Sequence, residues 1–485
     1  MRLRNVYTAL LSVAGFIMPA SAQMPARTDS MMLNANPWLH IYSNSEKTFR
    51  QYPMSDVLEL RFDGEAGKMT VNHSEKGDES VGMSDVKKWA IGPNVPRIDI
   101  DTYEYCYEIT SKTDYRYGRL TLDGRGIFPD ATIDSMRIRG RGNSTWSMPK
   151  KPYRLKFKTK TKLCGLKKGK NYVLLANYMD KSLMRNFVAD KFAQLIDMEY
   201  ANHVIPVDVY LNGLYKGSYM LTEKVGISNN SIDIPALDEP NSVLFEMDSY
   251  SADADEYPFT SSYYSLPVRI KDPDAPEDYA ECMQWVQAWK NDFEVMEKAV
   301  YNGTNVWDQI DLDSFVKYVM VFNFCTNQEL KHPKSCFLWK IRGQKYHFGP
   351  VWDFDWAFGY DDQWTGVNYQ IPLFSSSSDL GARFFLKLIK TDEFLTRYAE
   401  IWNDFYQNHL QEFYDAFDAY ADILECTAAN DATILEASSY HSYVPTPEAL
   451  RAWIEGHVEY INNPDNNYGL YSDSQGGWGG WGGWD

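Results

Sequence analysis

Two patterns of hydrophobicity divide this chain, and the change from one to the other limits the folds it can adopt. Apolar and polar residues alternate in several segments of the first half, namely 98–101, 115–122, 136–139 and 153–157. Alternation with a period of two is typical of half-buried β-strands. After about residue 276, apolar residues recur at spacings of three and four, in segments 276–301, 312–330 and 381–424. That spacing predicts helices, so the order indicates an α+β fold with a β-rich lobe followed by a helical lobe.

Two further elements interrupt these halves. Residues 180–196 have helical spacing inside the β-rich half, with Asp180 or Ser182 as the expected N-cap. Asn212-Gly213 predicts a hairpin between strands at 207–211 and 217–221. A second hairpin is expected in the helical half, where residues 336–341 and 346–353 flank Arg342-Gly343.

The two ends of the chain differ from its centre. Residues 1–22 have a basic start, a short apolar stretch and a small-x-small site, which predicts a secretory signal peptide and therefore export to the periplasm, cell surface or medium. Residues 23–95 contain Met-Ser-Asp-Val twice, at 54 and 83, each followed by a strand-like run, and we expect a small β module of two related hairpin units. The Gly- and Trp-rich residues 466–485 are expected to be a disordered tail. The main domain is then 96–465.

Charge and cysteine content exclude several classes of function. The formal net charge of −18 argues against non-specific binding to nucleic acid. No later stretch reaches the roughly 20 apolar residues of a transmembrane helix. Six scattered cysteines without a Cys-x-x-Cys pair give no zinc signature. Cys325 and Cys336 are the best candidates for a disulfide bond, although free buried thiols are equally compatible with the sequence.

One segment places two carboxylates among large apolar residues. Residues 349–359 read Gly-Pro-Val-Trp-Asp-Phe-Asp-Trp-Ala-Phe-Gly. If 351–356 were extended, Asp353 and Asp355 would share one face, about 6.6 Å apart at Cα, and Trp352, Phe354 and Trp356 would share the other. The pair is either the solvated acidic face of an ordinary strand or a divalent-metal site, since two such carboxylates need a neutralising cation.

The position of this segment favours the metal site. A predicted helix ends near Asn327-Gln-Glu-Leu330, a loop follows at 331–335, and the second hairpin leads to Asp353. Kinase-type phosphoryl-transfer enzymes place a catalytic loop, a hairpin and a metal-binding Asp in this order.

Several motifs resemble those of the CotH kinase family, the spore-coat-type atypical protein kinases. They are Arg-Gly-Arg-Gly-Asn-Ser-Thr-Trp at 139–146, Lys-Lys-Pro-Tyr-Arg-Leu-Lys-Phe at 150–157, Leu-Leu-Ala-Asn-Tyr-Met-Asp at 174–180 with Met-Arg-Asn at 184–186, Val-Tyr-Leu-Asn-Gly at 209–213 with Tyr-Met-Leu-Thr-Glu at 219–223, and 349–359. The resemblance extends over roughly residues 96–465. It implies a two-lobed protein-kinase-like fold that binds ATP with Mg²⁺ or Mn²⁺ and phosphorylates Ser or Thr of a protein substrate.

The resemblance also suggests how the nucleotide is bound. Lys156 is expected to pair with the nucleotide phosphates, with Arg154 as the alternative because it points the same way by period two; a solvated strand lysine is the plain interpretation of Lys156. Asn143 would add donors from a Gly-containing loop that is otherwise an ordinary tight turn. Glu223 is expected near the nucleotide, at the passage between the lobes.

The catalytic residues follow with one departure from the family pattern. Asp353 is expected to hold the metal, with Asp355 as a second ligand or as an acceptor behind the first. Family members carry an Asp shortly before the hairpin that accepts the substrate proton, and this chain has none between residues 324 and 337. Glu329 is the substitute base, or a surface residue at a helix end, and Asn327 is a possible metal ligand.

Two other functions are compatible with part of these observations. A catalytically inactive kinase-like fold that serves as a surface or extracellular binding protein would explain the missing Asp. A glycosidase with Asp353 and Asp355 as acid and base is disfavoured, because two acids on one strand cannot readily flank a sugar bond.

Overall fold

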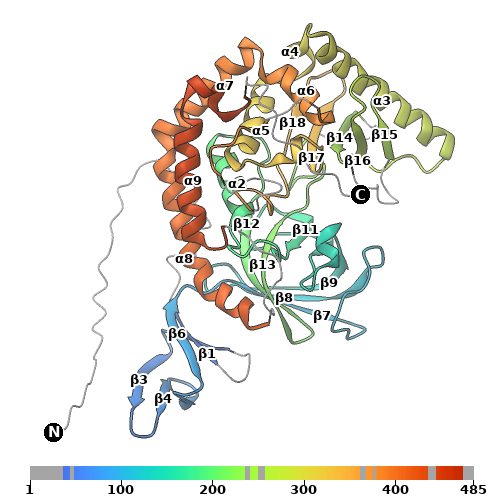
Figure 1. The fold of residues 1–485 in the computed structure, drawn as a ribbon. Helices are drawn as coiled ribbons and strands as arrows, with labels where there is room; N and C mark the ends of the chain where they lie inside the picture. Colours follow the sequence, from blue (N-terminus) through green and yellow to red (C-terminus); the bar gives the residue numbers. More distant parts are fainter. Residues whose placement is uncertain are drawn as a thin grey trace, which may run out of the picture.

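The computed structural model describes residues 37–43, 49–234, 241–249, 257–360, 368–374, 378–434 and 444–472. The predicted signal peptide lies outside these residues, as does the tail beyond Ser472. The fold is mixed α+β, with a small β module at one end, a β-barrel next to it and a helical part beyond the barrel (Figure 1).

The small β module consists of two three-stranded sheets. One has the order β2-β1-β6, and the other has the order β3-β4-β5. Their bounds are β1 (Trp38–Ser43), β2 (Phe49–Pro53), β3 (Val57–Asp63), β4 (Lys68–His73), β5 (Gly77–Gly82) and β6 (Val86–Gly92). Both Met-Ser-Asp-Val repeats begin in turns, where Asp56 N donates to Pro53 O and Asp85 N donates to Gly82 O. Each turn leads into the strand that the sequence predicted, β3 or β6.

The alternating segments close into a barrel with the strand order β10-β11-β13-β12-β7-β8-β9. Its strands are β7 (Arg97–Thr102), β8 (Arg116–Asp123), β9 (Ala131–Gly140), β10 (Tyr153–Thr161), β11 (Gly169–Leu175), β12 (Val204–Leu211) and β13 (Leu214–Glu223). The hairpin at Asn212-Gly213 is confirmed as β12–β13. Along β10, Tyr153, Leu155 and Phe157 are buried in the barrel core, so Arg154 and Lys156 lie on the opposite face.

The helical part contains a sheet that the sequence reading missed. The expected hairpin is present as β17 (Cys336–Ile341) and β18 (Tyr346–Phe348), but it belongs to a five-stranded sheet with the order β15-β16-β14-β17-β18. The additional strands are β14 (Ser242–Met247), β15 (Tyr257–Thr260) and β16 (Pro267–Asp272). β14 is buried along its whole length and therefore shows no alternation, which explains why period-two patterns did not reveal it.

Helices cover this sheet and enclose the largest core of the molecule. They are α2 (Arg185–Leu195), α3 (Tyr279–Asn302), α4 (Val306–Gln309), α5 (Leu312–Cys325), the 3₁₀ turn η2 (Gln328–Leu330), α6 (Leu380–Ile389), α7 (Asp392–Asp404), α8 (Leu410–Ile434) and α9 (Pro447–Ile461). The helix expected at 312–330 stops at Cys325, because Thr326 takes a left-handed conformation. The chain stays folded beyond residue 466, since η4 (Pro464–Gly469) is followed by buried Leu470 and Tyr471.

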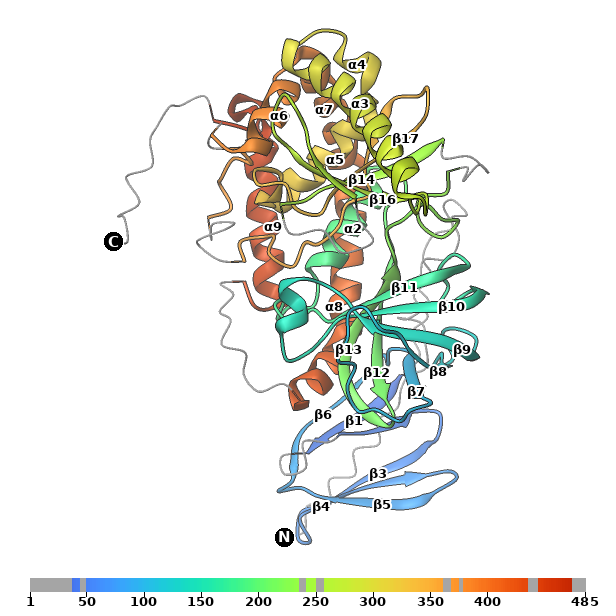
Figure 2. The same ribbon diagram turned by 90° about the vertical axis from the view of Figure 1, so that its right-hand side faces the viewer.

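Helix α8 connects the three parts. It contacts β13 of the barrel and also β1 and β6 of the small module, as both ribbon views show (Figure 2). The Tyr42 hydroxyl donates to Cys426 O at 3.0 Å, and the Lys150 Nζ of the barrel lies 2.6 Å from Asp431 Oδ1 in a buried ion pair. The helix therefore joins the barrel to the small module by specific polar contacts.

The expected disulfide bond is wrong. Cys325 and Cys336 are both buried free thiols, as are most of the other cysteines. Within the described residues, no helix is both long enough and apolar enough to cross a membrane.

Candidate functional site

A cavity of about 290 Å³ lies between the barrel and the helical part. This volume is at the small end of the range for small-molecule sites. The barrel contributes β10, β11 and the loop after β9, and the other wall consists of the ends of β14 and β16 with the loops after η2 and β18. The charged and polar lining residues include Lys112, Arg139, Arg141, Asn143, Arg154, Asn186, Lys224, Glu246, Asp248, Arg269, Asp272, Asp274, Glu329, Lys334, Ser335, Asp353 and Asp355.

The barrel wall carries clustered cations. Arg139 and Arg154 stand directly opposite each other on β9 and β10, and Arg141 follows immediately after β9. Like charges at opposed positions on neighbouring strands destabilise a sheet. This wall is therefore suited to an anionic ligand, whose binding would offset the repulsion.

The opposite wall carries carboxylates. Asp248 follows β14, Asp353 and Asp355 follow β18, and Glu329 lies in η2. Asp248 is paired with Arg269, whose Nη2 lies 3.5 Å from Asp248 Oδ1. This wall also carries Arg269, Lys271 and Lys334, but its carboxylates outnumber these cations, so the two walls differ in the sign of their net charge.

Asp353 and Asp355 do reach one cavity, but the expected strand that would carry them is wrong. Residues 351–356 form an irregular loop, because β18 ends at Phe348 and Asp353 has a φ of 69°. Asp tolerates this left-handed region better than most residues. The expected separation of faces also fails, since Trp352 and Trp356 line the same cavity as the two carboxylates.

Helix α2 fixes the shape of this loop through Asn186. The Asn186 Nδ2 donates to Asp355 Oδ1, and its Oδ1 accepts the Phe354 N–H at 2.9 Å. One amide side chain therefore replaces the strand pairing that the sequence suggested. It also determines where the Asp355 carboxylate points.

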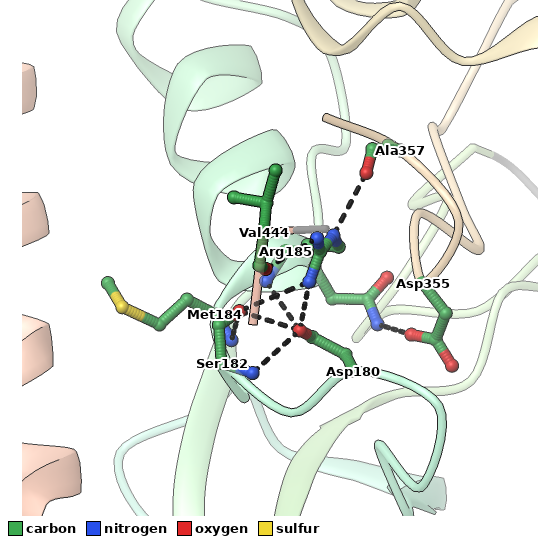
Figure 3. A network of polar contacts seen from close by, with 8 residues as sticks. Asp180, Ser182, Met184, Arg185, Asp355, Ala357 and Val444 are labelled. Carbon is green, nitrogen blue, oxygen red and sulfur yellow. Dashed lines mark hydrogen bonds and ion pairs between the residues drawn. The ribbon is translucent and has the colours of Figure 1, made fainter. Parts of the chain in front are cut away.

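A buried ion pair holds the start of α2 against the same loop (Figure 3). Arg185 is fully buried and binds the Asp180 carboxylate, the Ala357 carbonyl oxygen at 2.9 Å and the Val444 carbonyl oxygen at 2.9 Å. The expected N-cap is wrong in position, because the N-cap residue is Met184. Asp180 nevertheless accepts the Arg185 N–H at 2.9 Å, so its carboxylate satisfies a donor at the helix start.

Electrostatics at the acidic wall disfavour three ionised carboxylates. Burial, followed by the charges of Asp353 and Asp180, raises the pKa of Asp355 to about 7. The position of Asp353 inside the cavity, away from bulk water, and the charge of Asp248 raise its pKa, whereas Arg141 and a hydrogen bond from Ser335 lower it. Burial and the charge of Asp353 raise the pKa of Glu329 well above its usual range. A bound cation would relieve this repulsion.

The donor set fits a divalent metal that is completed by ligand oxygens. Within the described residues, no group of three or more His, Cys, Asp and Glu side chains is close enough to hold a metal alone. Mg²⁺ is usually bound by one or two carboxylates together with phosphate oxygens and waters. Asp353, whose side chain is exposed to the cavity, and Asp355 behind it match that requirement.

Glu329 and Asn327 have different positions. Glu329 lines the cavity, and its Oε2 is buried without a hydrogen-bond partner among the described residues. Asn327 is buried behind it and does not line the cavity; its Oδ1 accepts the Glu329 N–H at 2.8 Å, and its Nδ2 lies 3.4 Å from Asp353 O. Asn327 is placed to orient both residues rather than to bind a ligand itself.

Of the residues that the sequence predicted to bind the nucleotide, some line the cavity and others do not. Arg154 and Asn143 line the cavity, whereas Lys156 and Glu223 do not. Lys156 lies two residues beyond Arg154 on β10, where it is partly exposed and pairs with Arg137 of β9. Glu223 is buried and accepts the His203 N–H at 2.9 Å. Its neighbour Lys224 reaches the cavity instead.

Two glycines allow the loop after β9 to close tightly over the cavity. A Cβ on Gly140 would lie 2.1 Å from the Trp146 ring. Gly142 has a φ of 86°, and its Cβ would meet Thr145 Oγ1 at 2.3 Å. Both positions therefore favour glycine. The loop is a tight turn and it also lines the cavity, so the structural and the ligand-binding interpretations of these glycines do not exclude each other.

Several lining residues were given no role from the sequence, among them Arg141, Asn186 and Asp248. Arg141 and Asn186 belong to motifs that the resemblance includes, so their signal was present without an assigned role. Asp248 ends a strand that was not predicted, and no spacing links it to Asp353, more than a hundred positions later.

Comparison with known proteins assigns the family. No curated protein sequence matches this chain. A family model described as CotH kinase protein matches residues 138–461, which include barrel strands β10 to β13, helices α2 to α9 and every cavity-lining residue except Lys112. This chain belongs to the CotH kinase family.

Proposed function

We propose that this protein is a kinase that transfers the γ-phosphoryl group of ATP to a Ser or Thr hydroxyl of a protein, with Mg²⁺ or Mn²⁺. One observation carries the proposal: a single cavity has clustered cations on the barrel wall and carboxylates on the facing wall. A metal–nucleotide complex is a ligand with both an anionic phosphate chain and a cation, so it complements both walls.

The arrangement of elements supports a kinase-like division into two lobes. The barrel would be the nucleotide-covering lobe, with the loop after β9 above the phosphates. The helical part presents η2, the β17–β18 hairpin and Asp353 in the order that kinases use for the catalytic loop, hairpin and metal-binding residue. The closed barrel is a departure from the open sheet that such a lobe would have.

The residues of the acidic wall would hold the metal and orient the acceptor. A divalent metal at Asp353 would neutralise charge on the phosphate chain. Asp355 would support the metal from a position set by Asn186. On the barrel wall, Arg154 and Arg139 would contact phosphate oxygens, since guanidinium groups bind phosphate through paired hydrogen bonds.

Glu329 is the proposed acceptor of the substrate proton. Its carboxylate faces the cavity beside Asp353 and has an oxygen without a described partner. A cation at Asp353 would lower the Glu329 pKa and so make it available as a base. Asp248, also in the cavity, is the second carboxylate that a test must separate from it.

Radiolabel transfer from ATP tests the proposal. Purified protein is incubated with ³²P-labelled ATP and Mg²⁺ or Mn²⁺, with and without a generic Ser/Thr-containing acceptor, next to Asp353→Asn. We expect metal-dependent transfer that Asp353→Asn lowers by about 100- to 1,000-fold, comparable to the loss of other groups that stabilise transition-state charge. The matched control is Asp308→Asn, an exposed acid on α4 outside the cavity.

The outcomes also identify the residue that accepts the substrate proton and distinguish an active kinase from an inactive binding protein. Glu329→Gln should lose transfer while keeping nucleotide binding, and Asp248→Asn should keep more transfer than Glu329→Gln. The reverse order would assign the proton acceptor to Asp248. Absence of both transfer and a nucleotide-induced shift in melting temperature would favour an inactive binding protein and contradict the proposal.

A further inference from the structure

Arg141 reaches the cavity with no hydrogen-bond or ion-pair partner for its guanidinium among the described residues. It lines the cavity, is partly exposed to it, and forms no side-chain hydrogen bond or ion pair with the residues that the structure describes. Its guanidinium lies 5.4 Å from the centre of the Trp352 ring. An Arg side chain offers five N–H donors, and burying them without acceptors is costly. This residue is therefore suited to donate to a bound ligand.

The backbone holds Arg141 firmly in this position. Its N–H donates to Pro152 O at 3.2 Å, and the following carbonyl, of Gly142, accepts Lys112 Nζ at 2.9 Å. The flanking residue Arg139 donates in turn to Lys112 O at 2.5 Å. The loop is thus tied to the barrel on both sides of Arg141, and the ring of Trp352 limits where the side chain can point.

Charge alone does not explain this placement. Asp353, Asp355 and Glu246 attract the Arg141 guanidinium from across the cavity, while Arg154 repels it. A residue whose only role was to neutralise these carboxylates would be expected to pair directly with one of them. No described carboxylate is within ion-pair distance, so a gap remains between the guanidinium and the acidic wall.

We propose that Arg141 binds the phosphate chain of the ligand, bridging it to the metal-binding carboxylates from the barrel side. The planar guanidinium can donate two parallel hydrogen bonds to phosphate oxygens, which a lysine cannot. A phosphate chain in the gap would face Arg141 on one side and a cation held by Asp353 on the other. This inference rests on the proposed function, because it adds Arg141 to the arginines proposed to bind phosphate in the same site.

Binding calorimetry with three probes tests the inference: ATP, inorganic tripolyphosphate and adenosine, each with Mn²⁺. Arg141→Gln should weaken ATP and tripolyphosphate by about 10- to 100-fold, as expected for the loss of charge-assisted hydrogen bonds. Adenosine affinity should change by less than about twofold, because it has no phosphates. The affinities of Arg141→Lys for ATP and tripolyphosphate should lie between those of Arg141→Gln and the unmodified protein, since lysine keeps the charge but cannot donate two parallel hydrogen bonds.

Arg137→Gln is the matched control. Arg137 is another partly buried arginine of β9, also stacked on an aromatic ring, but it does not line the cavity. It should change all three affinities by less than about threefold. Equal losses in Arg137→Gln and Arg141→Gln would indicate a general charge effect and overturn the inference.

A second measurement distinguishes phosphate binding from a structural role. Without any phosphate ligand, Mn²⁺ should bind Arg141→Gln about 3- to 10-fold more tightly than the unmodified protein, because a competing positive charge has been removed. A destabilised site would instead bind Mn²⁺ more weakly, which would contradict the proposal.

The result also separates this inference from the proposed function. If tripolyphosphate binding depends on Arg141 but no phosphoryl transfer occurs, the inference stands and the kinase function fails. If Arg141→Gln binds ATP as the unmodified protein does, the inference fails and the kinase function stands. If the unmodified protein binds neither ATP nor tripolyphosphate, both are wrong.

Discussion

The two walls of the cavity are built from different parts of the fold and are supported in different ways. The barrel wall presents arginines whose neighbours are backbone carbonyls and aromatic rings, as at Arg139 and Arg141. The acidic wall presents carboxylates on loops that a buried network holds from behind, through Asn186 and Arg185. The cations are thus positioned by the loop and strands that carry them, whereas the acids are positioned by a helix from elsewhere in the chain.

This difference indicates that the acidic wall lowers the stability of the folded protein. Asp353, Asp355 and Glu329 on the acidic wall have raised pKa values because burial and the charges of neighbouring carboxylates oppose their ionisation. Functional sites commonly concentrate such unfavourable groups. We therefore expect changes behind the acidic wall to act on stability and metal binding, and changes on the barrel wall to act mainly on anion binding.

The largest effect is expected at the buried support of the acidic wall. Arg185→Met removes the partner of buried Asp180 and should lower the free energy of unfolding by about 3–5 kcal/mol, as for other buried pairs broken on one side. Arg397→Met breaks an exposed pair with Asp313 and should cost less than about 1 kcal/mol. Urea unfolding measures both, and equal losses would show that the network behind the wall has no special role.

The next effect concerns the orientation of the loop that we propose binds the metal. Asn186→Ala removes both bonds to the loop and should weaken Mn²⁺ binding by about 10- to 100-fold, the usual cost of losing a residue that orients a metal ligand. Asn291→Ala, on the surface of α3, serves as the control. Electron paramagnetic resonance of free Mn²⁺ reports the affinity, and unchanged binding in Asn186→Ala would exclude an orienting role.

On the barrel wall, two neighbouring cations should behave differently. Arg154→Gln should weaken ATP binding by about tenfold, because Arg154 lines the cavity, where its charge would face the phosphates of the proposed ligand. Lys156→Gln makes the same change in charge outside the cavity and should weaken binding by less than about twofold. A larger loss in Lys156→Gln would restore the assignment that the sequence favoured.

A further difference between the walls concerns the pH dependence of stability. The pKa of Asp355 is about 7 in the folded protein, above its usual value of 3.8, so the folded state binds this proton more tightly than the unfolded state does. Its contribution to stability is therefore complete below pH 4 and is lost as the pH rises through 7. Asp355→Asn should reduce the fall in unfolding free energy between pH 4.5 and 7.5 by up to about 3 kcal/mol when metal is removed with EDTA.

Unfolding curves at several pH values measure this difference. Asp353 and Glu329 remain in the variant and also have raised pKa values, so the slope should become shallower rather than vanish. Asp308→Asn should follow the unmodified protein. A variant with the original slope would show that Asp355 is not the group that titrates in this range.

Local patterns predicted the barrel strands and most helices, because alternation and helical spacing depend on one buried face. They failed where burial is complete or where tertiary contacts decide the conformation. β14 is buried on both faces and gave no alternation. Residues 351–356 looked like a strand from their alternation, but Asn186 binds Phe354 N and Asp355, and Asp353 adopts a left-handed conformation.

The candidate site was predictable in part for the same reasons. Family motifs and chain order were enough to predict five residues that line the cavity, namely Asp353, Asp355, Glu329, Arg154 and Asn143. Choosing between Arg154 and Lys156 required the register of β10 relative to the cavity, since both lie on the same face. Asp248 required knowledge of a contact between residues far apart in sequence.

Calorimetric titration of ATP in the presence and absence of Mn²⁺ tests the central claim most directly, namely that the two walls bind one metal–nucleotide complex. Mn²⁺ should tighten ATP binding by at least about tenfold in the unmodified protein, and Asp353→Asn should remove this gain while Arg154→Gln lowers ATP affinity with or without metal. Identical ATP affinities with and without Mn²⁺, or a full gain in Asp353→Asn, would contradict the account.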